Sequence, residues 1–290
     1  MPSLKETKGR IGSVKSTLKI TSAMKLVASA KLRKAQKATE ALRPYEATLI
    51  GILDSLGSGF ESQFARHQES PRSVVVIAMA SNSSLCGGFN ASAVRETLAV
   101  IDGALAVDPE KTSIEVISIG RKMADAMRKV GYPSVGEWHH LSEHPDYETA
   151  AEIVEGLMER FRKGEIDRVV MVYNHFVSTA SQKPVREELL PIAGFSSVNS
   201  DEGRVETEYI IEPSPAEVYA ELLPKTLRLK LYAALLDSAA AEHAARTVAM
   251  QTATDNGEDL LEELTLEYNK GRQQKITSEI LDIIGGSMQK

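Results

Sequence analysis

The sequence predicts an α/β protein in which the two ends of the chain form a long antiparallel two-helix coiled coil attached to a central α/β domain. Three observations predict this fold. Heptad patterns of small and apolar residues extend through both ends of the 290-residue chain, and short apolar runs alternate with amphipathic segments between them. Such alternation is typical of a mostly parallel open sheet, a Rossmann-like arrangement. Aromatic residues make up only 5% of the chain, which favours slender helices over one compact core.

The N-terminal arm, residues 1–59, is predicted to be one long helix. Residues 3–6 (SLKE) match a capping box, in which the Ser and Glu side chains satisfy free N–H groups of the first turn. Pro44 removes one backbone donor, so we expect a kink there and not an end. The glycines of residues 57–59 (GSG) then break the helix.

A heptad seam along this helix is typical of a coiled coil. It runs through Met24, Ala28, Lys31, Ala35, Ala38, Leu42, Tyr45, Leu49, Ile52 and Leu56. Lys31 is the only charged member of the seam. The seam is out of phase with the earlier apolar positions, so we expect an irregular supercoil between Leu18 and Met24.

The C-terminal arm, residues 209–290, is predicted to form a second long helix that pairs with the first. Ser214 at the N-cap, Pro215 at the first helical position and Glu217 at the third are a strong start signal. Its seam runs through Leu227, Leu231, Ala234, Ser238, Ala241, Ala245, Val248 and Thr252, loses regularity near residue 256, and resumes through Leu261, Leu264, Tyr268, Ile276, Ile280 and Ile283.

Both seams are rich in small residues, which let two helices approach closely but bury little apolar area. A rod built in this way gains more stability when a partner encloses it. We therefore expect a thin shaft whose tip is held inside another protein. Two ordinary bundle helices packed on the central domain are the alternative.

The central domain, residues 70–200, is predicted to contain a sheet with helical layers. Strands are expected over residues 73–79, 113–119 and 167–176, with a fourth at an edge over residues 184–191. Helices are expected over residues 90–107, 121–130 and 147–162.

Composition limits the classes of function. A net charge of −6 argues against a general nucleic-acid binder. The single cysteine, Cys86, excludes an internal disulfide and a cysteine-rich zinc site, and it fits a reducing compartment. The chain has no apolar run of about 18 residues and no apolar leader, so neither a membrane span nor a signal peptide is expected. We expect a soluble protein, cytoplasmic in a bacterium, that can still bind a membrane-embedded partner.

The central domain offers no recognisable active site. Residues 84–90 (SLCGGFN) follow a strand and open a helix, but their spacing fits neither the dinucleotide fingerprint nor the P-loop. Cys86 has no identifiable base, so a buried structural role is favoured over a reactive thiolate. The histidines within residues 139–144 match no zinc pattern, and residues 81–84 lack a Gly-x-Ser-x-Gly motif. We expect no catalytic residue, no metal and no cofactor.

The polar residues of most interest lie on the long helices. Residues 269–275 (NKGRQQK) form a cationic stretch near the end of the second helix. Within it, Arg272 and Gln273 offer donors suited to a carboxylate or a backbone. At the tip of an enclosed rod these side chains would be contact points.

Four co-linear segments resemble one family. They are residues 19–35 (KITSAMKLVASAKLRKA), 85–90 (LCGGFN), 245–257 (ARTVAMQTATDNG) and 266–273 (LEYNKGRQ). By these motifs the chain resembles, from end to end, the gamma subunit of the bacterial F-type, proton-translocating ATP synthase. The resemblance implies the central rotary stalk, a non-catalytic subunit that couples rotation of a membrane c ring to ATP synthesis or hydrolysis elsewhere.

The resemblance also implies partners and contact residues. The partners would be three alpha and three beta subunits around the helix pair, with the epsilon subunit and the c ring at the base. The chain would be a peripheral membrane protein on the cytoplasmic side of the bacterial inner membrane. The implied contacts are Arg272, Gln273 and Thr277 with a beta-subunit loop, Met24 and Lys25 near the beta-subunit lever, and Tyr209 and Glu212 near epsilon and the c ring.

Two departures from the family pattern matter. Many members carry Asp-Arg-Gly where this chain has Asn82, Ser83 and Ser84, so this chain lacks the charged side chains of that segment. Gly271 replaces the usual alanine, which softens the helix by about 0.5–1 kcal/mol. Two other readings stay open on the residues alone: an α/β enzyme with a coiled-coil arm, and a coiled-coil adaptor that does not rotate.

Overall fold

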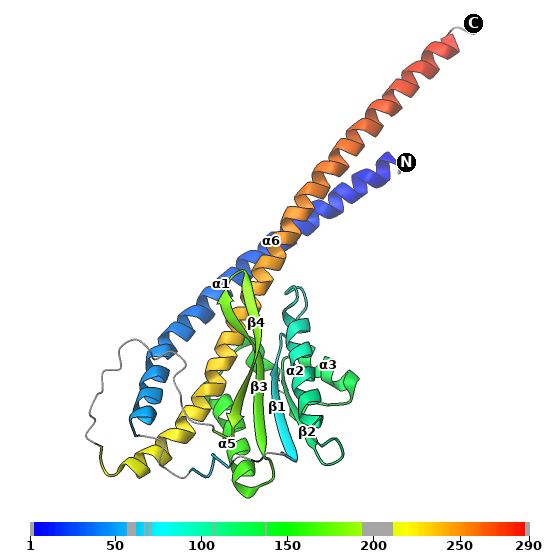
Figure 1. Ribbon diagram of the computed structural model, residues 1–290. Helices are drawn as coiled ribbons and strands as arrows, with labels where there is room; N and C mark the ends of the chain where they lie inside the picture. The colour runs from blue at the N-terminus through cyan, green and yellow to red at the C-terminus, as the bar shows by residue number, and fades with distance from the viewer. Residues whose placement is uncertain are drawn as a thin grey trace. The chain divides into compact units, whose positions relative to one another are not determined.

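The computed structural model describes residues 3–56, 62–66, 68, 71–106, 108–136, 138–192 and 211–287. Its elements, in chain order, are α1 (Leu4–Leu56), β1 (Ser73–Met79), α2 (Phe89–Leu105), β2 (Ser113–Ile119), α3 (Arg121–Val130), α4 (His140–Glu143), α5 (Tyr147–Lys163), β3 (Arg168–Ser178), β4 (Ser181–Leu190) and α6 (Pro215–Ser287) (Figure 1). The predicted long helices at both ends are therefore confirmed. The joins of the predicted three-part division near residues 60 and 200 lie outside the described residues, so that division stays a prediction.

The chain divides into two compact units. The smaller unit contains residues 1–28 and 246–290, and the larger unit contains residues 29–245. Both long helices run through this boundary, so each unit holds one part of α1 and one part of α6. The two units are described separately.

The larger unit is built on a four-stranded sheet with the strand order β2-β1-β3-β4. β1 pairs in parallel with β2 and with β3, and β3 and β4 form an antiparallel hairpin. The three predicted strands and the predicted edge strand are all present. The edge strand begins earlier than expected, at Ser181, because its polar first half pairs with the exposed end of β3.

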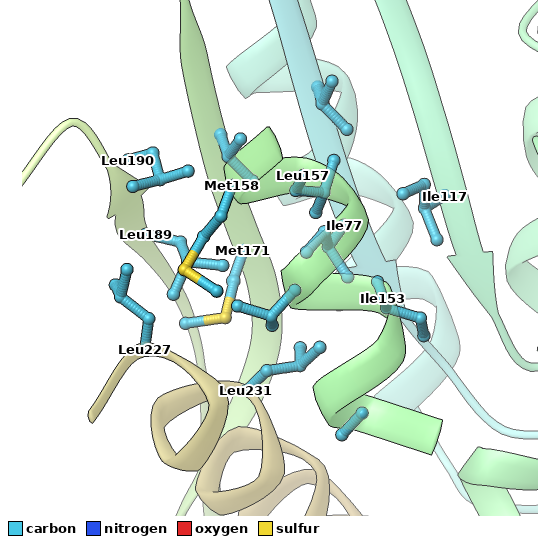
Figure 2. Close-up of a cluster of buried hydrophobic side chains, with 14 of the residues drawn as sticks. Ile77, Ile117, Ile153, Leu157, Met158, Met171, Leu189, Leu190, Leu227 and Leu231 are labelled. Carbon is cyan, nitrogen blue, oxygen red and sulfur yellow. The ribbon is translucent and has the colours of Figure 1, made fainter. Parts of the chain in front are cut away.

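Helices cover both faces of this sheet. On one face, alternate residues of β1 and β3 pack against α2 and α3, with Val76, Val172, Ile101 and Met123 among them. On the other face, Ile77 and Met171 meet side chains from α5 and α6, as Figure 2 shows for Leu157, Met158, Leu227 and Leu231. Burial of both faces explains why the strand sequences are continuous apolar runs with no polar alternation.

In the larger unit, α1 pairs with α6 through small residues. Leu32 and Ala35 pack on Ala240 and Ala244, with Phe176 of β3 beside them. Ala244 has no exposed surface and Ala240 has 2%, so the helices lie close together, as the small-residue seam predicted. This contact confirms the antiparallel pairing of the chain ends.

The predicted phase of the α1 seam was wrong by one residue at several positions. Leu32 and Leu53 are buried where Lys31 and Ile52 were expected, Lys31 is exposed, and Tyr45 is 55% exposed. The seam was placed by step length alone, and Lys31 fits the step. A charged side chain is excluded from such a close helix contact, because no partner there would offset the free-energy cost of removing the charge from water.

The smaller unit contains a second stretch of the antiparallel pair. The Thr21 and Thr254 hydroxyls are 2.9 Å apart, and the Lys25 ammonium donates to the Gln251 side chain. Thr21 is buried and continues the heptad steps of the earlier apolar residues towards Ala28. The expected phase break between residues 18 and 24 was therefore wrong, because a threonine fills the seam position.

Part of the α6 seam was also predicted wrongly. In the smaller unit the predicted member Leu264 is buried. Met250 is buried where Val248 and Thr252 were expected, and those two residues are exposed. The expected members Ile276, Ile280 and Ile283 are all exposed, because α1 begins only at Leu4 and supplies no residue opposite them. Within the described residues, no helix has the length and apolar content needed to cross a membrane.

Candidate partner-binding surface

The exposed end of α6 carries three of the predicted contact residues. Arg272, Gln273 and Thr277 are all exposed and follow one another along the helix. The Thr277 hydroxyl donates to the Gln273 backbone carbonyl at 3.0 Å, a contact that does not involve the Gln273 side-chain amide. The guanidinium and amide groups therefore face solvent with donors suited to bidentate contact.

Met24 and Lys25 lie on α1 in the same unit and form a separate patch. Both are half-buried, and Lys25 is tied to Gln251, whose amide also donates to Asp255 at 2.6 Å. Residue 251 precedes residue 272 by a distance of about 30 Å along a helix. The structure thus separates the predicted contacts on this unit into two places.

The remaining two predicted contacts are Glu212 and Tyr209. Glu212 is exposed, in the larger unit just before α6 begins. Tyr209 lies outside the described residues. The residue assignments as partner contacts stay predictions.

Exposed apolar side chains surround the polar contacts on the smaller unit. On α1, Leu26 is 71% exposed and Val27 is 57% exposed. On α6, Leu266, Leu281 and Ile283 are each more than half exposed. A group of exposed aliphatic side chains beside cationic residues is typical of a surface that contacts another protein. Of these residues, sequence reasoning singled out only Ile283, and it predicted a seam position and not an exposed one.

A groove also opens between the two helices at this end. It encloses about 790 Å³ and is lined by residues that include Leu4, Thr7, Leu266, Lys270, Gly271 and Gln274. The groove shows that the helix pair leaves apolar surface uncovered between its helices. Its lining residues Lys270, Gly271 and Gln274 flank Arg272 in the sequence of α6.

The turn after β1 packs against neighbouring elements of the larger unit. The strand order changes direction between β1 and β3, which is where open α/β sheets usually hold ligands. Here Asn174 donates to the Phe89 carbonyl at 3.0 Å, and Cys86 and Phe89 pack on Ala241 of α6. Asn174 and Phe89 thus contact each other at this point, and Cys86 is buried, as predicted.

The other candidate groups of the central domain make internal contacts. The Ser81 hydroxyl is fully buried and lies 2.6 Å from the Ser83 carbonyl. Asn82 donates to the His139 carbonyl at 2.9 Å and to Glu143 at 3.1 Å. Among the described residues, no three His, Cys, Asp or Glu side chains are grouped as metal ligands.

A charged cluster joins the β3–β4 hairpin to the long helices in the larger unit. Asp237 of α6 accepts from the Phe176 backbone N–H at 3.0 Å and contacts His175 Nδ1 at 2.5 Å. Lys230 pairs with Glu187 at 3.0 Å. Burial, followed by the charge of Glu187, raises the pKa of Glu46 on α1 above its usual value. This cluster holds the hairpin on the helices by charge as well as by apolar contact.

Comparisons with known proteins agree with this arrangement. A family model described as ATP synthase matches residues 3–288. The chain is 50% identical over 292 residues to an ATP synthase gamma chain of Phocaeicola vulgatus, covering 99% of this chain and 100% of the relative. It is 47% identical to an ATP synthase gamma chain of Bacteroides fragilis, with 99% and 100% covered.

Solved structures share the fold at lower identity. A chain of the Euglena gracilis mitochondrial ATP synthase in rotational state 3 aligns with a TM-score of 0.67 at 22% identity, covering 98% of this chain and 93% of that one. A chain from the central stalk and c ring of the Tetrahymena thermophila mitochondrial ATP synthase aligns with a TM-score of 0.56 at 23% identity, covering 81% and 99%.

Proposed function

This chain belongs to the ATP synthase gamma chain family, and we propose that it is the central rotary stalk that couples proton-driven rotation of a membrane c ring to conformational change at catalytic beta subunits. The observation that carries the proposal is the smaller unit. There, two antiparallel helices expose cationic and aliphatic side chains.

The chain contributes position and torque, and the chemistry belongs to its partners. Residues of the surrounding ring meet a different face of the helix pair at each orientation, because the pair has no threefold symmetry. Each orientation therefore favours different states of the three beta subunits. Nucleotide binding must drive the helix pair in return, since coupling between sites is reciprocal.

The contact residues are assigned in three groups. Arg272, Gln273 and Thr277 bind a beta-subunit loop, and Met24 with Lys25 faces the beta-subunit lever. Exposure of the first group supports its assignment, and the hydrogen bond from Lys25 to Gln251 holds the Lys25 ammonium in one place on the helix pair. Tyr209 and Glu212 bind the epsilon subunit and the c ring, which places the chain at the cytoplasmic side of the bacterial inner membrane as a peripheral subunit.

Co-purification tests the assembly. The tagged chain should bring down alpha, beta and epsilon subunits together with an ATPase activity that it lacks alone. A coiled-coil adaptor that does not rotate would bring down partners without a change in their ATPase activity. Recovery of the chain without any ATPase subunit would contradict the proposal.

Charge reversal tests the contact residues. Lys25→Glu should reduce proton-coupled ATP synthesis in membrane vesicles, because it reverses the charge that faces an acidic lever. Lys15→Glu is the matched control, since Lys15 is an exposed lysine on the same helix. Equal synthesis rates in the two variants would reject the role of Lys25. A chain truncated after Lys270 that develops full torque would reject the role of Arg272.

A further inference from the structure

Two glycines of α6 in the smaller unit lie directly against leucines of α1. A Cβ atom added to Gly257 would lie 2.7 Å from Leu18 Cδ2, and one added to Gly271 would lie 3.2 Å from Leu4 Cδ2. Gly12 of α1, in the same unit, has no heavy atom within 4 Å of the same added atom. At each of these two α6 glycines, a leucine of α1 therefore occupies the space that a side chain would otherwise fill. We call the two glycine positions notches.

The spacing of these contacts is the same on both helices. Leu4 and Leu18 are two heptads apart, and so are Gly257 and Gly271. The hydrogen bond between Thr21 and Thr254 belongs to the same alignment. Thr21 follows Leu18 by three residues, and Thr254 precedes Gly257 by three residues. A shift of one heptad in either direction would take the leucine from both notches and would bring Ile11 against only one of them. A shift of two heptads would bring Leu18 and Leu32 to the two glycines, but it would take Leu32 away from Ala240 and Ala244.

The surroundings make these contacts important for this stretch. Leu4 and Leu18 are only half-buried, and the groove beside Leu4 leaves the end of the pair incompletely packed. The other seam positions of α1 here include threonines, which bury little apolar area. Each leucine packs directly on the backbone of the facing glycine and gains van der Waals contacts there. Two large side chains facing each other could not both reach the opposite backbone.

We propose that the Leu18–Gly257 and Leu4–Gly271 pairs fasten the first turns of α1 onto α6 and favour the observed alignment of the two helices over a slip of one heptad. Gly271, the α6 residue of the second pair, directly precedes Arg272 in the sequence. These four residues thus position the point at which α6 leaves α1, and with it the start of the exposed stretch that carries Gln273 and Thr277. The proposal concerns the chain itself and holds whether or not the partners are those of a rotary motor.

Hydrogen exchange of the full-length chain tests the proposal, with the amides of residues 4–21 as the readout. Gly257→Leu places two leucines in one space, so exchange in this segment should accelerate about ten-fold. The swap Leu18→Ala with Gly257→Leu returns one leucine to the contact from the opposite helix, and should restore most of the protection. Gly12→Leu is the control and should not accelerate exchange, because its added side chain enters open space.

The two pairs should differ in strength. Gly271→Leu should accelerate exchange less than Gly257→Leu does, since its leucine lies further away and beside the groove. Unchanged exchange in Gly257→Leu would overturn the proposal. So would a swap variant that exchanges as fast as the single variant, since the effect would then come from bulk on α6 and not from the pairing of a leucine with a notch.

Discussion

Replacement of Leu32 by alanine should destabilise the larger unit strongly, whereas the same change at Lys31 should not. Leu32 is 6% exposed and packs on Ala240 and Ala244. Loss of its side chain leaves a cavity between backbones that two alanines keep close, so the expected loss is about 2–4 kcal/mol. Lys31→Ala removes an exposed side chain and should change the free energy of unfolding by less than about 0.5 kcal/mol.

Urea unfolding measures this difference. The only tryptophan, Trp138, packs against the core of the larger unit, so its fluorescence reports unfolding of that unit. With a slope of about 2 kcal/mol/M, Leu32→Ala should lower the midpoint by roughly 1–2 M urea. Hydrogen exchange of residues 29–40 checks for local separation of α1. Equal midpoints and equal exchange in the two variants would refute the seam described here and favour the one predicted by step length.

Three further changes test other parts of the larger unit. Glu46→Gln should stabilise the larger unit at neutral pH. Because folding raises the pKa of Glu46, the gain in stability should be absent below the unfolded-state pKa and should grow as pH rises through the folded-state pKa. Thermal melts across pH 4–8 measure this gain. Gly120→Ala should lower the free energy of unfolding, measured by urea titration, by more than about 3 kcal/mol. The φ angle of Gly120 is +96°, and an added Cβ would lie 2.0 Å from the Ala80 carbonyl oxygen. A loss below about 1 kcal/mol would contradict this turn geometry. Asp237→Ala should speed amide exchange at Phe176, whose N–H loses its acceptor, while leaving β1 protected; uniform loss of protection would instead indicate a general core defect.

Most of the fold could be predicted from sequence because its signals are local. Apolar runs located β1, β2 and β3, and the Ser-Pro-x-Glu start located α6 within one residue. The antiparallel pairing of the chain ends followed from two seams of similar composition. These features depend on periodicity and capping, which the amino-acid order contains directly.

The side-chain phase of the long helices could not be predicted as well. Steps of three and four residues allow either Lys31 or Leu32 at the seam position. Only the close approach of α1 to Ala240 of α6 determines that Leu32 is the buried residue. Thr21 was missed as a seam member for the same reason, because its burial depends on a hydrogen bond to a residue far along the chain. Contacts of this kind are set by the partner helix.

The candidate site was predictable only in part. The exposed cationic stretch around Arg272 followed from charge and from the resemblance, whereas the notch role of Gly257 had no sequence signal. A glycine within a helix predicts weakness, and only the facing leucine turns it into a packing position. The exposed Leu26 and Leu281 were missed because single aliphatic residues on a helix carry no pattern.

Observation of rotation tests the central claim most directly. In an assembly whose beta subunits are fixed to a surface, a probe is attached at Lys111→Cys, an exposed position of the larger unit, with the buried Cys86 left in place. If the chain is the rotary stalk, the probe turns in one direction during ATP hydrolysis and stops when the nucleotide is removed. A probe that stays still while ATP is hydrolysed at the full rate would contradict the rotary role.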